Sequence, residues 1–394
     1  MKRYLEIDTG ELKRRNSYHT AREICQQPRL WRQAYAQIDA SRDQIDNWLA
    51  PILATPNLRI LLCGAGTSAY IGETVAAWLR KAWNTVPAAR VTAVSTTELT
   101  ADPAQYLSHN VPTLMISFAR SGDSPESLAS VELADQQLAY CRHLIVTCNP
   151  EGRLARLAGT HKGALCLLMP GDANDRGFAM TSSHTTMLVS ALAIFTPDRA
   201  QLEQAGVLAQ KILDDGSATI AAVASLDFDR LVVLGAGCLE GIAREAALKC
   251  LELTAGKVVA LYETPLGFRH GPKIFIDEST VVVHLRSNDE HTKLYDRDLL
   301  RELETDGRSA AIVDLNPMTL AGDIGAAGSA AELNDAWLSV VYVVHCQILA
   351  FQRAMALGVE ADNPCPTGEV NRVVDGVTIY PFRGRGQVAT GEES

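Results

Sequence analysis

Short apolar runs that end in glycine, each followed by a helical pattern of apolar positions, recur along the chain. The run Leu58–Gly64 leads into Gly66 and then into a segment with Val75, Ala76 and Leu79 on one helical face. Continuous apolar runs of this length are typical of parallel strands that are buried on both faces. The glycines are typical of a tight turn at the start of a helix. The pattern therefore predicts a strand, a turn and a helix N-terminus.

The same pattern returns 171 residues later, where the run 230–235 ends in Gly235-Ala-Gly237 and precedes a helical segment. The next apolar runs, 113–119 and 280–285, repeat at an offset near 166 residues. Strands that alternate with helices in two sequential copies predict an α/β fold of two tandem doubly wound, flavodoxin-like domains with central parallel sheets flanked by helices. Further strands are expected at 144–147, 165–168 and 311–314.

These patterns divide the chain into three parts. We expect an N-terminal helical segment at 1–57, a first domain at 58–210 and a second domain at 211–394. Thr20-Ala-Arg-Glu23 has the pattern of a capping box and predicts a helix that opens there. The stretch 336–351 is strongly apolar but contains His345 and Gln347. We interpret it as a core helix that is too short to span a bilayer.

The net charge and the cysteine content limit the kinds of partner and the cellular compartment that we expect. The formal net charge of −10 argues against non-specific binding to nucleic acid, which needs a basic face. Nine scattered cysteines without a C-x-x-C pair, together with a start that does not resemble an export signal, indicate free thiols in a reducing compartment. We therefore expect a cytoplasmic protein with no membrane partner, no metal and no cofactor.

Neither glycine turn fits a dinucleotide site. Both lack the third glycine of G-x-G-x-x-G, and no acidic residue completes that fingerprint. No Cys/His spacing is typical of metal ligation either. Most histidines are interpreted as structural or solvated, namely those at 19, 109, 143, 161, 284, 291 and 345.

The loop after the second strand of the first half predicts an anion site. Ser121, Gly122 and Ser124 precede Pro125, which suits the first turn of a helix. Hydroxyls, a flexible glycine and free helix N–H groups can together cradle a phosphate. The alternative is that one of the serines is a plain N-cap. The hydroxyls of Thr67-Ser68 at the neighbouring turn favour phosphate.

The second half provides an internal comparison. Its matching loop reads Ser287-Asn288-Asp289-Glu290, so the glycine is replaced and a carboxylate stands where a hydroxyl stood. A phosphate bound there would meet negative charge. The repeat therefore predicts one phosphate loop, in the first half, and one loop that has diverged.

Acid–base residues gather instead in the second half. Glu245, Lys249 and Glu252 have i, i+4, i+7 spacing, which places them on one helix face. They are either a solvated ion pair or a carboxylate base beside an ammonium. His270, between glycine and proline, is expected on an exposed loop and suits proton transfer at neutral pH. The hydroxyl run that includes Thr181 and Ser182 could bind sugar hydroxyls or phosphate.

Together these motifs resemble a known family. The Gly64-Ala-Gly-Thr-Ser turn, the Ser-Gly-x-Ser loop, Arg-Glu-Ala-Ala-Leu-Lys-x-x-Glu and Phe-Arg-His-Gly-Pro look like the sugar isomerase (SIS) domain, in the order of the isomerase half of glucosamine-6-phosphate synthase. Arg176-Gly-Phe-Ala-Met-Thr-Ser-Ser and Asn371-Arg-Val-Val-Asp-Gly-Val are similar to the AgaS branch, called tagatose-6-phosphate ketose/aldose isomerase or galactosamine-6-phosphate deaminase. The resemblance covers roughly residues 20 to 382.

The resemblance implies roles residue by residue. Glu252 would be the base that moves a proton between C1 and C2, with Lys249 and Glu245 in supporting positions. His270 would open the sugar ring in the site of a neighbouring subunit, which implies a homo-oligomer. The synthase also uses a lysine near its C-terminus, where this chain has Arg372, so the residue in that role is open. The remaining expected substrate contacts are Gly66, Thr67, Ser68, Arg120, Ser121, Gly122, Ser124, Thr181 and Ser182.

The synthase carries a glutaminase domain, whereas about 57 residues precede the first strand here. We therefore expect the reaction that releases ammonia from an amino-hexose 6-phosphate, most simply galactosamine 6-phosphate, through an enolamine. Three alternatives stay open. They are a ketose/aldose isomerase, a fructosamine-6-phosphate deglycase and a sugar-phosphate-binding regulator without turnover.

Overall fold

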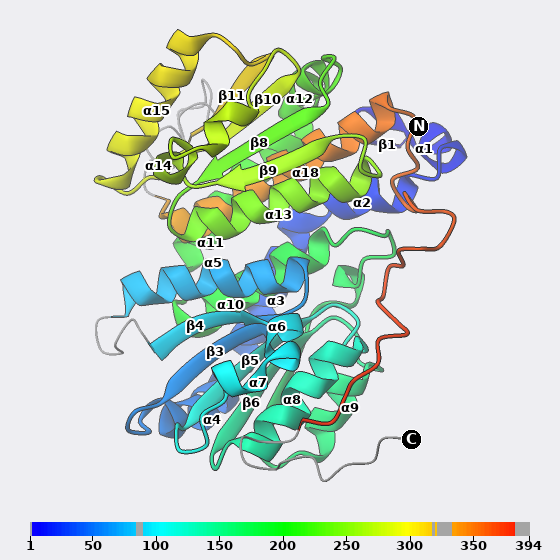
Figure 1. Cartoon of the computed structure of the whole chain (residues 1–394). Coiled ribbons are helices and arrows are strands. Elements are labelled where there is room, and N and C mark those ends of the chain that lie inside the picture. Colours follow the sequence, from blue (N-terminus) through cyan, green and yellow to red (C-terminus); the bar gives the residue numbers. More distant parts are fainter. Residues whose placement is uncertain (1, 84–89, 317–319, 321–332, 383–394) are drawn as a thin grey trace, which may run out of the picture.

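A computed structural model of the chain describes residues 2–83, 90–316, 320 and 333–382 (Figure 1). Two parallel sheets lie one above the other, and helices α5 (Thr67–Ala82) and α13 (Cys238–Leu253) pack side by side between them. The two sheets are the centres of the two halves predicted from the repeat. The predicted tandem α/β fold is confirmed.

The first sheet has five parallel strands in the order β4-β3-β5-β6-β7. This is the flavodoxin-like order, in which ligands bind beyond the carboxyl ends of the first and third strands. The strands are β3 (Arg59–Gly64), β4 (Val91–Ser95), β5 (Thr113–Ala119), β6 (Cys141–Thr147) and β7 (Ala164–Leu168). Its helices besides α5 are α6 (Thr96–Ala101), α7 (Pro103–Tyr106), α8 (Pro125–Gln137), α9 (Arg153–Thr160) and α10 (Ser182–Phe195).

The second sheet repeats the plan with four described parallel strands in the order β9-β8-β10-β11. Its strands are β8 (Arg230–Gly235), β9 (Val259–Glu263), β10 (Thr280–Leu285) and β11 (Ala311–Leu315). Its helices besides α13 are α14 (Pro265–Phe268), a 3₁₀ turn (Pro272–Phe275), α15 (Thr292–Asp306) and α18 (Asp335–Ala356). Strands β4 and β9 were not predicted: β4 is short and mixes polar with apolar residues, whereas the short apolar run 258–262 at β9 was overlooked.

Helices connect and cover the two halves. The N-terminal segment comprises a hairpin of β1 (Arg3–Tyr4) and β2 (Ile7–Asp8), then α1 (Thr9–Arg14), α2 (Tyr18–Cys25), α3 (Gln27–Ala40) and α4 (Arg42–Leu53). Helix α11 (Arg199–Lys211), a π-helical turn (Ile212–Gly216) and α12 (Ser217–Ala224) lead into the second half. The predicted capping box is wrong, because α2 begins at Tyr18 and the side chain of Thr20 bonds to Asp362 instead.

The long apolar stretch forms the 22-residue helix α18, which is long and apolar enough to cross a membrane by length and composition alone. The prediction that it is too short was therefore wrong. In the folded chain, however, 94% of its most apolar window is buried. It packs against α11, α12 and α13, which confirms the interpretation as a core helix.

The glycine turns at the start of α5 and α13 have the same geometry. Gly66 and Gly237 have φ of +52° and +61°, a left-handed conformation that favours glycine. A Cβ on Gly64 would lie 2.4 Å from the carbonyl carbon of Ser68, and one on Gly235 would lie 2.6 Å from the carbonyl oxygen of Leu239. The repeated glycines are therefore required where each strand passes directly under its helix.

Helices α5 and α13 run antiparallel and meet at equivalent positions of the repeat. A Cβ on Gly241 would lie 2.5 Å from the hydroxyl of Thr74, so the two helices approach closely. Beside that contact, Arg244 donates to Glu73 at 2.7 Å, and these two residues are separated by 171 positions. Because 171 is also the offset of the repeat, the pseudo-two-fold axis that relates the halves passes close to this ion pair.

Candidate active site

A cavity of about 280 Å³ lies beyond the carboxyl ends of β3 and β5. It contains eight of the fourteen residues predicted for the site. These are Gly66, Thr67, Ser68, Arg120, Ser121, Ser124, Glu252 and Arg372. A larger surface hollow of about 530 Å³, around Arg29 and Asp172, contains none of them. The smaller cavity is therefore the candidate site on chemical grounds.

The predicted phosphate loop lines one wall of this cavity. Ser124 is the N-cap residue of α8, but its side chain makes no capping hydrogen bond and lies 3.2 Å from the hydroxyl of Ser127. Ser121 accepts a long hydrogen bond of 3.3 Å from the backbone N–H of Asp123. Gly122 has φ of +69° and forms the turn without lining the cavity. The hydroxyls thus face the cavity at a helix N-terminus, which favours anion binding over a simple cap.

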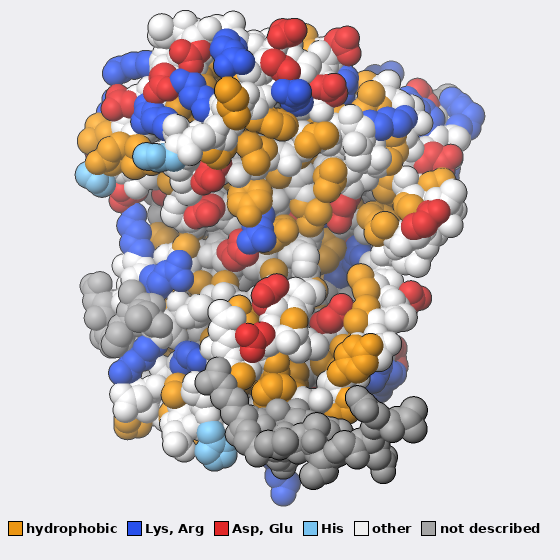
Figure 2. All heavy atoms as spheres, viewed as in Figure 1, with side chains coloured by type: hydrophobic (Ala, Val, Ile, Leu, Met, Phe, Trp, Pro, Cys, Tyr) orange, Lys and Arg blue, Asp and Glu red, His pale blue; other side chains and the backbone are white. Residues whose placement is uncertain are grey.

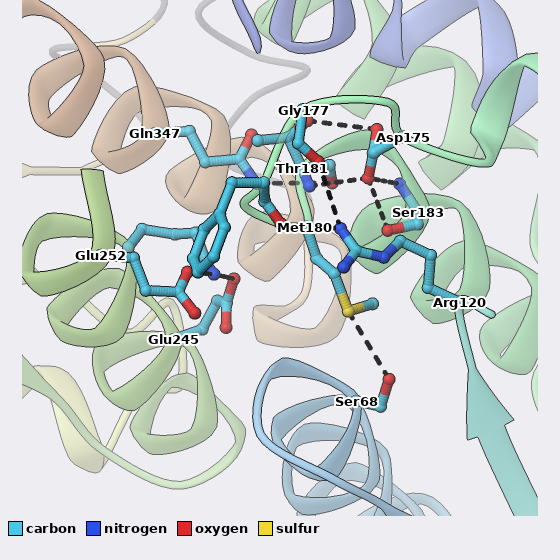
Figure 3. Close-up of polar contacts among 12 residues, drawn as sticks. Ser68, Arg120, Asp175, Gly177, Met180, Thr181, Ser183, Glu245, Glu252 and Gln347 are labelled. Carbon is cyan, nitrogen blue, oxygen red and sulfur yellow. Dashed lines mark hydrogen bonds and ion pairs between the residues drawn. The ribbon is translucent and has the colours of Figure 1, made fainter. Parts of the chain in front are cut away.

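Glu252 reaches the same cavity from the second half (Figure 3). It lies near the C-terminal end of α13, and its side chain is 25% exposed. The ammonium of Lys249 is in contact with it and lies 3.7 Å from Glu245. The side chains of Lys249 and Glu245 are fully buried and lie behind Glu252. The alternative of a solvated Glu–Lys pair is therefore wrong.

The two buried side chains, Lys249 and Glu245, have shifted pKa values because of their surroundings. Burial alone would lower the pKa of Lys249, but Glu245 and Glu252 outweigh it, and the pKa is raised. Burial raises the pKa of Glu245 to about 8, and Lys249 offsets this only in part. At neutral pH the ammonium therefore stays charged and pairs chiefly with Glu252. A charged, fully buried ammonium is a poor candidate for a Schiff base, which requires the free amine.

The second half contributes a further wall through residues 366–382, which we call the C-terminal strap. It leaves α18 and runs down along the first domain (Figure 1), so it does not stay with the second domain to which the sequence assigned it. Val370 to Val374 line the cavity, and Phe382 packs against an apolar cluster of the first domain. The guanidinium of Arg372 donates to the carbonyl of Asp175 at 2.9 Å and to the side chain of Asn174 at 3.0 Å.

Arg120 holds the strap from the other side. Its guanidinium donates to the carbonyl of Phe178 at 2.9 Å and contacts the carbonyl of Arg372. Burial and the nearby Arg372 lower its pKa to about 10, so it remains a cation at neutral pH. Both predicted arginines therefore border the cavity while their charged groups are engaged by backbone carbonyls.

Two predicted sugar contacts lie elsewhere. Thr181 and Ser182 are fully buried and do not line the cavity. Their hydroxyls and backbone N–H groups bond to the carboxylate of Asp175, which also accepts from Ser183 (Figure 3). The hydroxyl run is thus used to anchor the start of α10, and the expectation that it faces the substrate does not match this geometry.

His270 is exposed, as predicted, but does not line the cavity. It follows the carboxyl end of β9, which is parallel to β8 and therefore lies beside the start of α13. Glu252 is fourteen residues further along α13, or about 21 Å at 1.5 Å per residue. Within one chain these two residues therefore lie near opposite ends of the same helix.

The diverged loop of the second half is occupied by the chain itself. Asp335, at the start of α18, accepts a hydrogen bond of 2.6 Å from the hydroxyl of Ser287 and another of 2.6 Å from the backbone N–H of Asn288. Asp289 is paired with Lys81 at 2.6 Å. A carboxylate thus stands where the first half has room for a phosphate.

Among the described residues, one group of potential metal ligands lies in the first domain, away from the cavity. Asp135 lies 2.8 Å from Nε2 of His143 and 3.2 Å from Nε2 of His161. The backbone N–H of Gly163 donates to Nδ1 of His161, so the neutral ring carries its proton on Nε2, toward Asp135. This geometry favours hydrogen bonding over metal ligation.

Several cavity residues were missed from the sequence. Thr97, Glu126 and Ser127 lie in the first turns of α6 and α8, and Phe178 and Met180 lie in the loop before α10. The position of Glu126 and Ser127 directly after Ser124 was the available signal, because a phosphate at a helix N-terminus contacts the first turn. Phe178 and Met180 carry no comparable pattern.

Comparison with known proteins agrees with this architecture. The SIS domain model matches residues 52–197. The C-terminal domain of glucosamine-fructose-6-phosphate aminotransferase from Francisella tularensis has the same fold, with a TM-score of 0.67 at 20% identity over 87% of this chain and 98% of that chain. The predicted fold class is confirmed by this likeness.

Closer relatives extend over nearly the whole chain. The D-galactosamine-6-phosphate deaminase AgaS of Shewanella sp. (strain ANA-3) is 45% identical over 380 residues, which cover 96% of each chain. The protein of that name from Escherichia coli is 43% identical over 92% of this chain and 96% of its own. The crystal structure of tagatose-6-phosphate ketose/aldose isomerase from Escherichia coli has a TM-score of 0.81 at 38% identity, covering 93% of this chain and 97% of that chain. The chain therefore belongs to the AgaS family of SIS-domain proteins.

Proposed function

We propose that the protein isomerises and deaminates an amino-hexose 6-phosphate, converting galactosamine 6-phosphate to tagatose 6-phosphate and ammonia. The observation that carries the proposal is that Glu252 of one half and the serine loop of the other line a single cavity. A phosphate on Ser68, Ser121 and Ser124 would leave the sugar between the loop and Glu252. The relatives named deaminases support the amino sugar as substrate.

The chemistry follows from one positioned base. In the ring-opened substrate, Glu252 would take the C2 proton to give an enolamine and return a proton to C1. The resulting C2 ketimine reacts with water to give the ketose and ammonia. The ammonium of Lys249 orients Glu252 through their ion pair, and Lys249 itself does not line the cavity. The strap with Arg372 closes the cavity over the sugar.

We infer further that His270 acts in the site of a neighbouring copy, so that the active form is a homo-oligomer. The start of α13, beside which the His270 segment lies, is about 21 Å along the helix from Glu252, and this separation supports the inference. Exposed apolar side chains of the second half lie on α13, on β9 and on the segment around His270, and Figure 2 shows orange atoms over α13 and β9. They are Leu251, Val259, Leu266 and Ile274, and the last is 83% exposed. We also expect the enzyme to act in the cytoplasm.

Subunit mixing tests the oligomer. His270→Ala and Glu252→Gln subunits should each be inactive, and their mixture should recover roughly a quarter of wild-type activity, because a random two-fold dimer then carries one intact site in half of its molecules. The hybrid should be confirmed by native mass spectrometry. A confirmed hybrid without activity would mean that His270 does not serve a partner.

Ammonia release tests the reaction. The wild type should release ammonia from galactosamine 6-phosphate in a panel that includes glucosamine, fructosamine and tagatose 6-phosphates. Glu252→Gln should lower kcat by about 10²–10⁴ with little change in KM, because glutamine keeps the shape but takes no proton. Interconversion of ketose and aldose phosphates without ammonia release would instead support the isomerase that the Escherichia coli structure is named for.

A further inference from the structure

Glu23 of α2 makes a buried contact with the loop before α10. Its side chain accepts hydrogen bonds from the backbone N–H of Arg176 at 2.6 Å and of Gly177 at 3.1 Å. The residue is 4% exposed. A Cβ on Gly177 would lie 2.7 Å from the hydroxyl of Thr20 and 3.0 Å from Glu23. The helix and the loop are therefore so close that a side chain at position 177 would displace Thr20 or Glu23.

The opposite side of the same loop faces the cavity. Arg120 donates to the carbonyl of Phe178 at 2.9 Å and lies 3.5 Å from that of Gly177. Figure 3 shows Arg120 and Gly177 joined in this way, with Met180 pointing toward Ser68. Phe178 and Met180 both line the cavity. The backbone of the loop is thus held between Glu23 on its outer side and Arg120 on its inner side.

We propose that Glu23 is a positioning residue for sugar-phosphate binding, which holds the backbone at Arg176 and Gly177 and thereby sets the cavity wall formed by Phe178 and Met180. The inference rests on the proposed function in so far as it takes this cavity as the sugar-phosphate site. The inference goes beyond the proposed function because it assigns a role to a side chain of the N-terminal segment that does not line the cavity.

The charge around Glu23 makes this role dependent on pH. The carboxyl groups that face it are Asp175 on the loop and Asp362 on the segment after α18. Burial and then Asp175 raise the pKa of Glu23 to about 8, although the two backbone N–H groups lower it. The packed loop therefore favours the neutral acid. As pH rises through 8, ionisation beside two carboxylates opposes the packed loop, and the affinity for the sugar phosphate should fall.

Binding of galactitol 6-phosphate by calorimetry tests the role without turnover, because this open-chain polyol phosphate has no amino group to lose. Glu23→Ala should raise its Kd about tenfold, as expected for the loss of hydrogen bonds to one buried carboxyl group. Glu23→Gln imitates the neutral acid and should bind like the wild type at pH 6.5. At pH 9 the wild type should bind several times more weakly than Glu23→Gln. Effects of pH on the ligand are shared by both proteins and cancel in the ratio.

Glu360→Gln is the matched control, because Glu360 is exposed and bonds to Asn16 across the same contact between the chain termini. It should bind like the wild type at both pH values. In turnover assays Glu23→Ala should raise KM and leave kcat within about threefold. An unchanged Kd in Glu23→Ala, or a ratio of wild type to Glu23→Gln that stays constant from pH 6.5 to 9, would overturn the proposal.

Two further results separate the hypotheses. If Glu23→Ala does not fold, the comparison of the wild type with Glu23→Gln across pH decides alone. If the wild type binds galactitol 6-phosphate but releases no ammonia from galactosamine 6-phosphate, the deaminase proposal fails and the role of Glu23 is still measured. If the wild type releases ammonia but does not bind the polyol phosphate, KM decides, and an unchanged KM in Glu23→Ala would then overturn the role of Glu23 alone.

Discussion

Replacing Lys249 with methionine removes the ammonium between Glu245 and Glu252 while keeping a side chain of similar length. Loss of one partner from a buried ion pair costs about 3–5 kcal/mol when the remaining charge stays buried. Here water reaches Glu252, whose side chain is 25% exposed, and Glu245 is neutral at pH 7 because its pKa is raised to about 8. We therefore expect the lower end of that range, about 3 kcal/mol.

Urea unfolding at pH 7 measures this change as a lower midpoint at an unchanged slope. Glu245→Gln is the matched variant, because glutamine is neutral like the protonated acid, and it should stay within about 1 kcal/mol of the wild type. A Lys249→Met protein as stable as the wild type would show that the ammonium is not required to hold these carboxyl groups. Equal destabilisation by both variants would show that Glu245 is ionised and shares the pair.

Two further predictions concern pH and the repeat. The pKa of Glu245 is raised in the folded state, so its contribution to the free energy of unfolding is complete at low pH and is lost as pH rises toward 8. The wild type should therefore lose stability relative to Glu245→Gln between pH 5.5 and 8.5 in the same urea assay. Changing Ser121 and Ser124 together to alanine should raise KM for the sugar phosphate at least tenfold, whereas changing Ser287 and Asn288 to alanine should lower stability and leave KM nearly unchanged. Equal effects of the two pairs on KM would contradict the assignment of one phosphate loop.

The features that the sequence predicted well share a local cause. Gly66 and Gly237 are needed where a strand turns into a helix at this spacing, so the repeated unit of strand, turn and helix could be recognised from residue types alone. The helix face with Glu245, Lys249 and Glu252 follows from helical periodicity in the same way. These signals depend on residues close in the chain, which is why the two halves of the cavity could be predicted separately.

The features that the sequence did not predict depend on distant partners. The hydroxyls of Thr181 and Ser182 were interpreted as ligand contacts, because nothing nearby indicated that Asp175 binds them. Glu23 was interpreted as half of a capping box, although its partners are more than 150 residues away. The strap has no regular secondary structure and hence no period, so only Arg372 was expected at the site and the place of the other strap residues over the cavity came from the fold.

The ion pair between Arg244 and Glu73 bears on how such a chain could arise. In a dimer of two identical chains, a residue on the two-fold axis faces the same residue of the partner chain, so a charged side chain there would be repelled by an identical charge. Here the two equivalent positions belong to one continuous chain and carry opposite charges. Such an attraction is open to the two halves only because each can carry its own residue at the equivalent position. The contact therefore ties the halves into a unit that two separate identical chains could not reproduce.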